Sequence, residues 1–453
     1  MPKDNLKEML YLTHFDAIII GFGKAGKTLA GELAKRDWNV ALIEKDKTMY
    51  GGTCINIACI PTKLLMHDAL EKREYRAAVE RKNSVIGKLR DKNFHSVADL
   101  NKAKVYDAKA SFISDNEIEI EADNGTKEVL SADKIFINTG AESIVPPIDG
   151  DINSDKVYTS TTLIDEDILP DKLTIVGGGY IGLEFATMYN AFGSEISMIV
   201  PDDKILKSED SDVAAEITKD MQESGINFIF GERAEKVTEE NDNNITVTLS
   251  NGNVLTSNAV LFATGRQPNT KGLGLENTSV ELTDKKEIKV NNHLQTSAEN
   301  IFALGDVKGG MQFTYTSLDD FRIVKSHLFD DGAYSYDSRT NVHYTMFTDP
   351  PYSRAGLTLE ESLEKGHEAA ENSMPMSGHP RSHINNELRG LFKAVVDTET
   401  KEILGVHLYG VNSEELINLV KLAMDNNIPY TALRDQMYNH PVMSEAFNTL
   451  FDI

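Results

Sequence analysis

Short apolar runs rich in β-branched residues recur along the chain, and two of them lead directly into a glycine-rich turn. The first run, residues 15–20, has the composition of a strand that is buried on both faces. Residues 27–36 carry alanine and leucine at helical spacing, and residues 39–43 form a second apolar run that ends at Glu44. This order of strand, turn, helix, strand and acid predicts a βαβ unit. The turn between the first strand and the helix contains Gly21, Gly23 and Gly26.

The same order of elements recurs 156 residues later, counted from Gly21 to Gly177 (177 − 21 = 156). Residues 173–176 predict a strand, residues 183–192 a helix and residues 195–200 the following strand. We interpret the repeat as a second βαβ unit on the same chain. Its turn and the start of its helix contain Gly177, Gly179, Tyr180, Ile181 and Gly182.

A glycine turn between a strand and a helix suits a bound pyrophosphate, because glycine has no Cβ to obstruct the ligand and the helix start presents N–H groups. One such turn also serves plain packing, whereas two correctly placed turns favour two dinucleotide sites. Glu44 lies 18 residues after Gly26 (44 − 26 = 18), where a carboxylate accepts hydrogen bonds from adenosine ribose hydroxyls. Val200 follows Gly182 by the same distance (200 − 182 = 18), so the second site leaves NADH and NADPH open.

Between and after the two units, the pattern predicts helix, strands and loops. Residues 67–93 are amphipathic and rich in charge, which indicates one long helix, and residues 117–122 alternate as in a strand. Pro146, Pro147 and the acidic residues 149–155 indicate a domain boundary. The acidic, asparagine-rich residues 239–244 predict a loop between strands of the second unit.

From Tyr344 onward the composition changes and no further glycine turn of this kind follows. Residues 391–397 and 403–409 predict strands, and residues 413–426 predict a helix. We therefore expect a third domain in which a sheet packs against helices. The fold class that results is α/β, with two Rossmann-like domains and a C-terminal α+β domain.

The composition mainly excludes classes of partner and location. The chain has 453 residues, and 46 Lys and Arg against 71 Asp and Glu give a net charge of −25. That charge repels nucleic acid and anionic membranes, so we expect neither as a partner. The first residues lack the apolar core of a signal peptide, and no run approaches the ~18 apolar residues of a membrane span. We therefore expect a cytoplasmic protein.

The chain has only 2 cysteines, Cys54 and Cys59, and both lie directly after the first βαβ unit. A disulfide scaffold is excluded, and a metal site would need further ligands that no histidine cluster supplies, so we expect no metal. Cysteines five apart can close a disulfide across one helical turn, with Cys54 nearest the helix start and Cys59 one turn deeper. A thiolate at a helix N-terminus has a lowered pKa. A redox-active pair is favoured over two buried apolar side chains or a metal site.

The segment Gly51-Gly-Thr-Cys54-Ile-Asn-Ile-Ala-Cys59-Ile-Pro-Thr-Lys63 resembles that of pyridine nucleotide-disulfide oxidoreductases of the glutathione reductase and lipoamide dehydrogenase class. It departs only at Ala58, where these enzymes usually have glycine. The resemblance extends from about Phe15 to Asn448. Further matching segments are Asn138-Thr-Gly140, Ala263-Thr-Gly-Arg-Gln-Pro-Asn269, Ile301-Phe-Ala-Leu-Gly-Asp306-Val and His440-Pro-Val-Met-Ser-Glu445.

The resemblance implies FAD as cofactor and NADH or NADPH as reductant. It implies an FAD-binding domain at residues 1–155 and 281–343, an NAD(P)-binding domain at 156–280 and a dimerisation domain at 344–453. The residues that it assigns to cofactor binding are Gly21, Gly23, Gly26, Glu44, Gly52, Thr53, Lys63, Thr139, Gly140, Gly177, Gly179, Tyr180, Ile181, Gly182, Val200, Gly265, Arg266, Gly305 and Asp306.

The resemblance also implies catalytic roles. Cys59 is expected to face the flavin as a thiolate, and Cys54 to be the thiol that attacks the substrate. Lys63 and Glu184 are expected to form an ion pair beside the flavin. His440, held by Glu445, is expected to exchange a proton with Cys54 across a homodimer interface.

Within this class, residues 21–30, 49–56 and 313–320 are similar to bacterial reactive-chlorine-resistance flavoproteins, which act as hypothiocyanous acid (HOSCN) reductases. A reductase of a larger disulfide, such as glutathione disulfide or lipoamide, is the alternative within the class. A flavin redox sensor without turnover is the alternative outside it. A mercuric reductase, or a thioredoxin reductase that relays through a C-terminal thiol, is disfavoured because the chain has no further cysteine.

Overall fold

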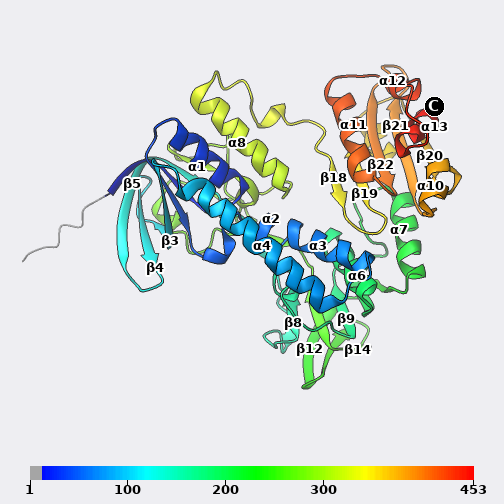
Figure 1. Ribbon diagram of the computed structural model, residues 1–453, viewed down its shortest axis with the longest axis horizontal. Helices are drawn as coiled ribbons and strands as arrows, with labels where there is room; N and C mark the ends of the chain where they lie inside the picture. Colours follow the sequence, from blue (N-terminus) through cyan, green and yellow to red (C-terminus); the bar gives the residue numbers. More distant parts are fainter. Residues whose placement is uncertain (1–12) are drawn as a thin grey trace, which may run out of the picture. The chain divides into compact units, whose positions relative to one another are not determined.

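The structure is a computed structural model that describes residues 13–453, and these form two compact units (Figure 1). Of the described residues, the first unit comprises 13–64, 79–144 and 265–338. The second comprises residues 65–78, 145–264 and 339–453. Each unit is therefore assembled from segments that are distant in the sequence.

The first unit is built on a parallel sheet in the order β3-β2-β1-β5-β17. Ile18 of β1 lies opposite Ala41 on one side and Ile135 on the other, so the first predicted strand is central, as its apolar composition requires. The strands are β1 (Thr13–Ile20), β2 (Val40–Glu44), β3 (Ala103–Phe112), β5 (Lys127–Ile137) and β17 (Ile301–Ala303).

Two hydrophobic clusters cover the two faces of this sheet. Ile19 belongs to the cluster formed with helices α1 (Lys24–Lys35) and α8 (Thr314–Phe329), and Ile18 belongs to the cluster on the opposite face. Successive residues of a strand point to opposite faces, which explains why neighbours join different clusters. β4 (Glu117–Ala122) forms as predicted and pairs with the second half of β3.

The single helix predicted for residues 67–93 is wrong. The chain forms α3 (Cys59–Leu70) and α4 (Tyr75–Ala98) instead. Lys72 has a left-handed backbone with φ of 57°, and the Glu74 carboxylate accepts hydrogen bonds from the backbone of Arg76 and Ala77 at 3.0 and 2.8 Å. The amphipathic pattern runs through this break, but Glu74 caps a new helix there.

The second βαβ unit forms a five-stranded parallel sheet in the order β11-β10-β9-β15-β8. Helix α6 (Tyr180–Phe192) follows β9 and begins directly after the second glycine turn. The strands are β8 (Val157–Thr159), β9 (Lys172–Val176), β10 (Glu195–Val200), β11 (Asn227–Phe230) and β15 (Ala259–Phe262).

A four-stranded sheet in the order β14-β13-β12-β7 belongs to the same unit. The loop predicted for residues 239–244 is wrong for most of its length, because β12 runs to Asn241 and β13 starts at Asn244. The Asn241 side chain accepts hydrogen bonds from the backbone of Asn243 and Asn244, which closes a tight turn. The strands are β7 (Asp149–Gly150), β12 (Ala234–Asn241), β13 (Asn244–Leu249) and β14 (Val254–Ser257).

The C-terminal segment forms an antiparallel sheet in the order β18-β19-β22-β21-β20, covered by α11 (Ser413–Asp425) (Figure 1). The two strands and the helix predicted here are confirmed. The strands are β18 (Tyr344–Met346), β19 (Tyr352–Gly356), β20 (Ala369–Pro375), β21 (Leu391–Asp397) and β22 (Ile403–Tyr409). In residues 13–453, no helix is long and apolar enough to cross a membrane.

Candidate active site

The first glycine turn lies at the carboxyl end of β1. Gly21 has φ of 106°, and a Cβ on it would stand 2.3 Å from the carbonyl oxygen of Asn138. The Asn138 side chain accepts a hydrogen bond from the backbone of Gly26 at 2.9 Å and donates one to Leu304 at 2.6 Å. Gly23 caps α1, whose first turn carries no acidic residue. The helix start is therefore electrostatically open to an anion.

Glu44 ends β2 beside this turn. One carboxylate oxygen accepts a hydrogen bond from the backbone of Phe22 at 2.9 Å, and the other accepts one from Asp46 at 3.2 Å. Burial raises the pKa of Glu44, although these backbone donors oppose the shift. The structure thus holds this carboxylate next to the glycine turn, as a ribose-binding acid requires.

The two cysteines follow this turn on two short helical segments. Gly52, with φ of 77°, caps α2 (Thr53–Asn56), which contains Cys54, and Cys59 is the first residue of α3. The prediction that Cys59 lies one turn deeper in the same helix is therefore wrong. Pro61 would remove a hydrogen bond from a continuous helix but is tolerated in the first turn of a new one.

Both cysteines are thiols in this structure and both are half-buried. The pKa of Cys54 is raised well above its ordinary value, first because its side chain is hydrogen-bonded to Cys59 and then because it is buried. Both effects favour the protonated form of Cys54. Thr314, the first residue of α8, lies with its hydroxyl 3.5 Å from Sγ of Cys59.

The predicted crossing segments pair with each other in the first unit. The Thr139 hydroxyl donates to the carbonyl of Asn269 at 2.8 Å, and the backbone of Asn269 donates to the carbonyl of Gly140 at 2.9 Å. Gly265 has φ of 112°, and the next residue, Arg266, donates through its guanidinium to the carbonyl of Ala141. The turn therefore places a half-buried cation beside Ala141, which begins β6 (Ala141–Ser143).

Asp306 belongs to the first unit, and the Arg266 guanidinium acts on its carboxylate. Burial raises the pKa of Asp306, while Arg266 and Lys308 oppose that shift. Burial also lowers the pKa of Arg266. The backbone of Gly305 donates to the Asp320 carboxylate at 2.7 Å, which fixes the backbone on which Asp306 stands.

The second glycine turn repeats the geometry of the first. Gly177 has φ of 119°, and a Cβ on it would stand 2.5 Å from the carbonyl oxygen of Ala263. A Cβ on Gly182 would stand 2.2 Å from the carbonyl of Gly177, and Gly179 caps α6, which opens with Tyr180 and Ile181. Val200 is buried beneath the turn, since a Cβ on Gly178 would stand 2.9 Å from it.

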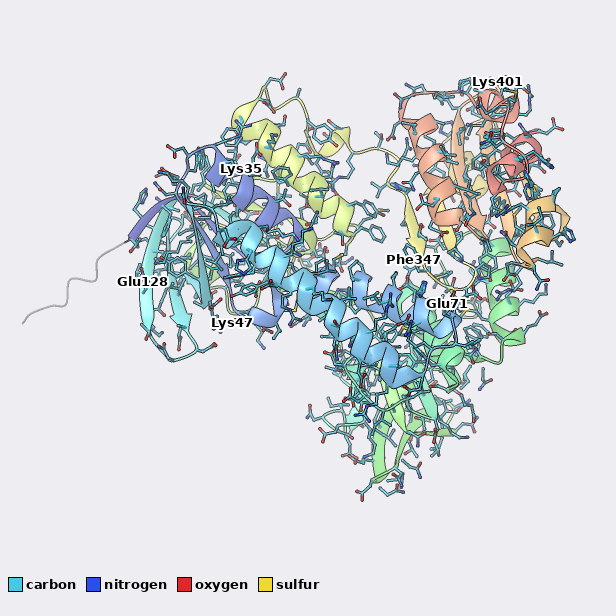
Figure 2. All side chains as sticks on the ribbon, viewed as in Figure 1. Lys35, Lys47, Glu71, Glu128, Phe347 and Lys401 are labelled. Atoms are coloured by element: carbon cyan, nitrogen blue, oxygen red, sulfur yellow. The ribbon has the colours of Figure 1, made fainter. Side chains whose placement is uncertain are left out.

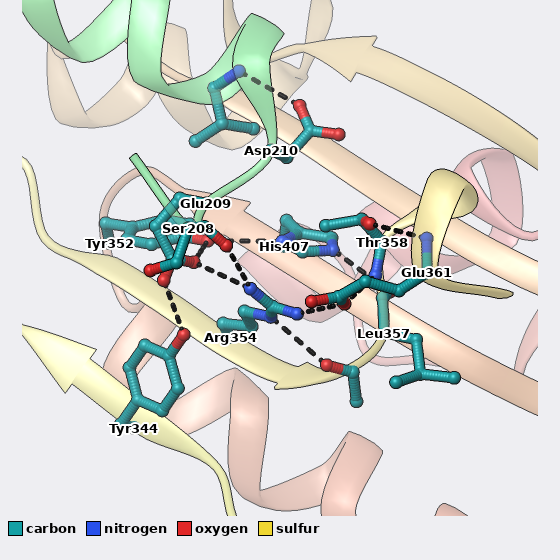
Figure 3. Close-up of polar contacts among 12 residues, drawn as sticks. Ser208, Glu209, Asp210, Tyr344, Tyr352, Arg354, Leu357, Thr358, Glu361 and His407 are labelled. Carbon is teal, nitrogen blue, oxygen red and sulfur yellow. Dashed lines mark hydrogen bonds and ion pairs between the residues drawn. The ribbon is translucent and has the colours of Figure 1, made fainter. Parts of the chain in front are cut away.

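Tyr180 is tied to a buried carboxylate of the same unit. Its phenol donates to Glu209 at 2.5 Å, and the phenols of Tyr344 and Tyr352 donate to the same carboxylate at 2.7 and 2.6 Å. The guanidinium of Arg354 forms an ion pair with the Glu209 carboxylate at 3.3 Å (Figure 3). Burial alone would raise the pKa of Glu209, but these donors lower it below its ordinary value. The start of α6 is thereby bonded to strands of the C-terminal sheet.

The residues predicted as an ion pair lie in different units. The Lys63 ammonium, on α3, donates to the hydroxyl of Thr62 at 3.4 Å. The Glu184 carboxylate, on α6, accepts a hydrogen bond from the backbone of Phe347, which is labelled in Figure 2, at 2.8 Å. The Lys63–Glu184 pair stays a prediction.

His440 and Glu445 lie together near the C-terminus. Nδ1 of His440 is 2.9 Å from a carboxylate oxygen of Glu445, and the backbone of Val442 donates to the other oxygen at 2.9 Å. These two donors, the backbone first, lower the pKa of Glu445. A carboxylate at Nδ1 selects the tautomer in which Nε2 accepts a proton.

The first unit fits FAD. Gly21 has no Cβ to obstruct a pyrophosphate, and the first turn of α1 has no acidic side chain to repel it. Glu44 supplies a carboxylate that can accept hydrogen bonds from sugar hydroxyls. Asp306 adds a second half-buried carboxylate. The second glycine turn offers the same cradle to a nicotinamide dinucleotide.

The chain matches two family models that together cover nearly all of it. Residues 15–320 match the model described as pyridine nucleotide-disulphide oxidoreductase, and residues 342–451 match its dimerisation domain. The chain belongs to the pyridine nucleotide-disulphide oxidoreductase family. Members of this family depend on FAD and use NAD(P)H, so the chain is a flavin-dependent oxidoreductase that acts on a sulfur group. The predicted fold class, enzyme class and cofactors are confirmed.

Relatives within the pyridine nucleotide-disulphide oxidoreductases match over nearly the whole length. The chain is 45% identical to the probable pyridine nucleotide-disulfide oxidoreductase RclA of Escherichia coli (strain K12), covering 98% of this chain and all of that one. It is 30% identical to the dihydrolipoyl dehydrogenase of Bacillus subtilis, covering 96% of each. The solved Cu(II) complex of HOCl-induced flavoprotein disulfide reductase RclA from Escherichia coli superimposes with a TM-score of 0.94 at 44% identity, covering 97% of this chain and 99% of that one. The chain is a flavoprotein disulfide reductase of the RclA type.

Several residues around this oxidoreductase site were not predicted. Asn138, inside a predicted motif, has a polar side chain directly after a buried strand, and that placement is the signal that could have identified it. Thr314 and Glu209 carry no local signal, because their partners Cys59 and Tyr344 are distant in the sequence.

Proposed function

We propose that this enzyme reduces hypothiocyanous acid to thiocyanate with electrons from NADH or NADPH. The observation that carries the proposal is the Cys54–Cys59 pair, which contains the only 2 cysteines of the chain. With no third thiol to relay electrons, the pair must pass them directly to an external oxidant. The similarity to an HOCl-induced reductase supports a role in oxidant defence.

FAD, which the Gly21 turn, Glu44 and Asp306 would hold, would supply the electron pair that reduces the Cys54–Cys59 disulfide, drawn from the nicotinamide. The protein then gives the two resulting thiols different surroundings. The hydrogen bond to Cys59 and burial raise the pKa of Cys54, which favours its protonated form. We propose that Cys59, beside the hydroxyl of Thr314, carries the negative charge of the reduced pair.

Cys54 performs the attack on the oxidant. Its sulfur loses a proton and forms an S–S bond to the sulfur of HOSCN, while the S–O bond breaks and the hydroxide takes a proton to leave as water. Cys59 then attacks Sγ of Cys54 and expels thiocyanate, which restores the disulfide. The sum is NAD(P)H and HOSCN to NAD(P)⁺, thiocyanate and water.

His440 is proposed to exchange the proton of Cys54. Glu445 orients the ring, and 71% of the His440 side chain is exposed, as a group that serves a neighbouring subunit would be. The match of residues 342–451 to a dimerisation domain supports a homodimer in which each His440 acts across the interface.

We propose that each of the three predicted domains has its own function. Residues 1–155 and 281–343 bind FAD, residues 156–280 bind the nicotinamide dinucleotide, and residues 344–453 form the dimer interface. Lys63 and Glu184 are proposed to pair beside the flavin. We propose a cytoplasmic location, since the enzyme consumes a reduced nicotinamide.

The aromatic side chains next to Thr314 support a small substrate. Phe313 and Tyr315 stack with ring centroids 5.2 Å apart and an interplanar angle of 8°. Tyr315 is exposed, at 40%, and both rings neighbour in sequence the threonine whose hydroxyl lies 3.5 Å from Sγ of Cys59. We propose that the two rings narrow the approach to the cysteine pair, which would disfavour a tripeptide or lipoyl disulfide.

The test is a steady-state comparison of HOSCN, glutathione disulfide and lipoamide with each nicotinamide. We expect HOSCN to be preferred by at least about tenfold in kcat/KM, and Cys54→Ser to abolish its reduction while nicotinamide still reduces the flavin. Preference for glutathione disulfide or lipoamide would overturn the substrate. Retained HOSCN turnover in the Cys54→Ser enzyme would overturn the thiol chemistry, and reduction without discharge by any oxidant would indicate a sensor.

A further inference from the structure

A lysine of the first unit is bonded to a side chain that packs against the loop leading into the redox pair, and it has no part in the mechanism above. Lys27 stands on α1, directly after the third glycine of the first turn, and is half-buried. Its ammonium donates a hydrogen bond to the side-chain oxygen of Asn93, on α4. A half-buried ammonium with a fixed acceptor has little of the freedom of a surface lysine.

Asn93 is itself held in place. Its side-chain nitrogen donates to the carbonyl of Leu89 at 2.6 Å, which leaves the oxygen facing Lys27. A Cβ on Gly51 would stand 3.2 Å from Asn93, so the loop that leads into Cys54 lies against this side chain.

The same loop also lies on the turn that precedes Lys27. A Cβ on Gly52 would stand 2.7 Å from Cα of Gly23. The start of α1, the middle of α4 and the loop before Cys54 therefore pack against one another. On the α4 side the nearby cation is Arg90, whose guanidinium donates to Asn56 of α2 at 2.9 Å.

The charges of Lys27 and Cys54 act on each other. Burial and the neighbouring Lys24 lower the pKa of Lys27 to about 8, while a Cys54 thiolate opposes that shift. In return Lys27 lowers the pKa of Cys54, against the larger effects of Cys59 and of burial. Lys24 and Cys54 are thus the ionisable groups that act on this ammonium, and Arg90 of α4 bonds to the neighbouring Asn56.

We propose that Lys27, held by Asn93, is a positioning residue that stabilises the Cys54 thiolate as it attacks the oxidant. This inference rests on the proposed role of Cys54. The negative charge on Sγ is greatest after the proton has left and before the S–S bond forms, so a fixed cation there accelerates the step. The role is specific to oxidants that are attacked by a thiolate and release a small anion.

The test measures the thiol and does not require HOSCN. The holoenzyme is reduced with NADPH or NADH and exposed to iodoacetamide across a pH series, and mass spectrometry follows alkylation of the Cys54 peptide. Lys27→Met removes the charge. Lys35→Met is the matched control, because Lys35 is an exposed lysine in the last turn of the same helix, labelled in Figure 2.

We expect Lys27→Met to shift the alkylation profile up by about one pH unit and to slow alkylation near pH 7 about tenfold. Lys27→Arg and Lys35→Met should keep the profile of the parent enzyme. Asn93→Leu, which frees the ammonium, should shift it in the same direction by less. Profiles of Lys27→Met that superimpose on the parent overturn the proposal.

If the Lys27→Met enzyme does not retain flavin, the Asn93→Leu enzyme serves as the test. An alkylation profile of Asn93→Leu that matches the parent enzyme then overturns the proposal. The two hypotheses fail separately. A shifted profile in an enzyme that does not turn over HOSCN refutes the substrate and leaves the role of Lys27 intact.

Discussion

Nδ1 of His440 lies 2.9 Å from a carboxylate oxygen of Glu445, and the second oxygen of that carboxylate is bonded to the backbone of Val442. The carboxylate is therefore fixed before it orients the ring. A ring fixed in this way presents Nε2 as its basic atom, which is the arrangement of a proton acceptor for a thiol.

Glu445→Gln tests this orientation. The amide no longer selects the tautomer, so we expect kcat with the physiological oxidant to fall about 10- to 100-fold, while nicotinamide reduces the flavin at an unchanged rate. Stopped-flow reduction and steady-state turnover separate the two steps. His367→Gln is the control, because His367 pairs with Asp397 at 3.1 Å in the same domain but has no proposed role. Equal losses in both variants would contradict the assignment.

Thr314 is expected to stabilise the thiolate of the pair. Its hydroxyl lies 3.5 Å from Sγ of Cys59 and lowers the pKa of Cys54. Thr314→Val should therefore raise the apparent pKa of the reduced pair by about half a unit to one unit. The ultraviolet absorbance of the thiolate, followed against pH, measures this shift. Thr314→Ser keeps the hydroxyl and should titrate like the parent; a shift there too would point to packing.

Gly21→Ala is expected to abolish FAD binding. The position has φ of 106°, and the added methyl would stand 2.3 Å from the carbonyl oxygen of Asn138. The purified protein should lack the visible flavin spectrum. Gly31 lies within α1, which follows this turn, and has open space around it, so the Gly31→Ala enzyme should bind FAD normally. The helix with alanine at that position should also be more stable by about 0.5–1 kcal/mol. Full flavin content in Gly21→Ala would refute the placement of the cofactor.

Glu209→Gln is expected to destabilise the second unit. The carboxylate side chain is 1% exposed and accepts from Arg354 and three phenols, so its loss should cost about 3 kcal/mol of unfolding free energy. Glu216→Gln on α7 (Ser211–Glu223) is the control, because Glu216 pairs with Lys219 at the surface and should cost less than about 0.5 kcal/mol.

Glu209 also predicts a dependence on pH. Its pKa in the folded chain lies below the ordinary value, so its contribution to stability is complete above the pKa of the unfolded chain, about 4.3. The contribution is lost as the pH falls through the lower, folded-state pKa. Denaturant titrations should show a steeper loss of stability in acid for the parent than for Glu209→Gln. Parallel curves would contradict the role of this carboxylate.

Residues close together in the sequence were predictable. The two glycine turns, Glu44, the cysteine pair and the His440 segment are contiguous patterns whose chemistry depends on spacing, so the fold class, the family and its cofactors followed from the sequence. The predictions for residues 67–93 and 239–244 were wrong because one capping carboxylate or one asparagine turn overrides a periodic or compositional signal.

What only the tertiary structure decided is which distant side chains surround the site. Thr314 lies beside Cys59 although 255 residues separate them, and Asn93 holds Lys27 across 66 residues. Glu209 takes its partners from the helix after the second glycine turn and from β18 and β19. Packing of whole elements creates such contacts, and neither periodicity nor motif spacing encodes them. The sequence by itself thus determined the class of chemistry, and the fold determined which charges and hydroxyls adjust its thiols.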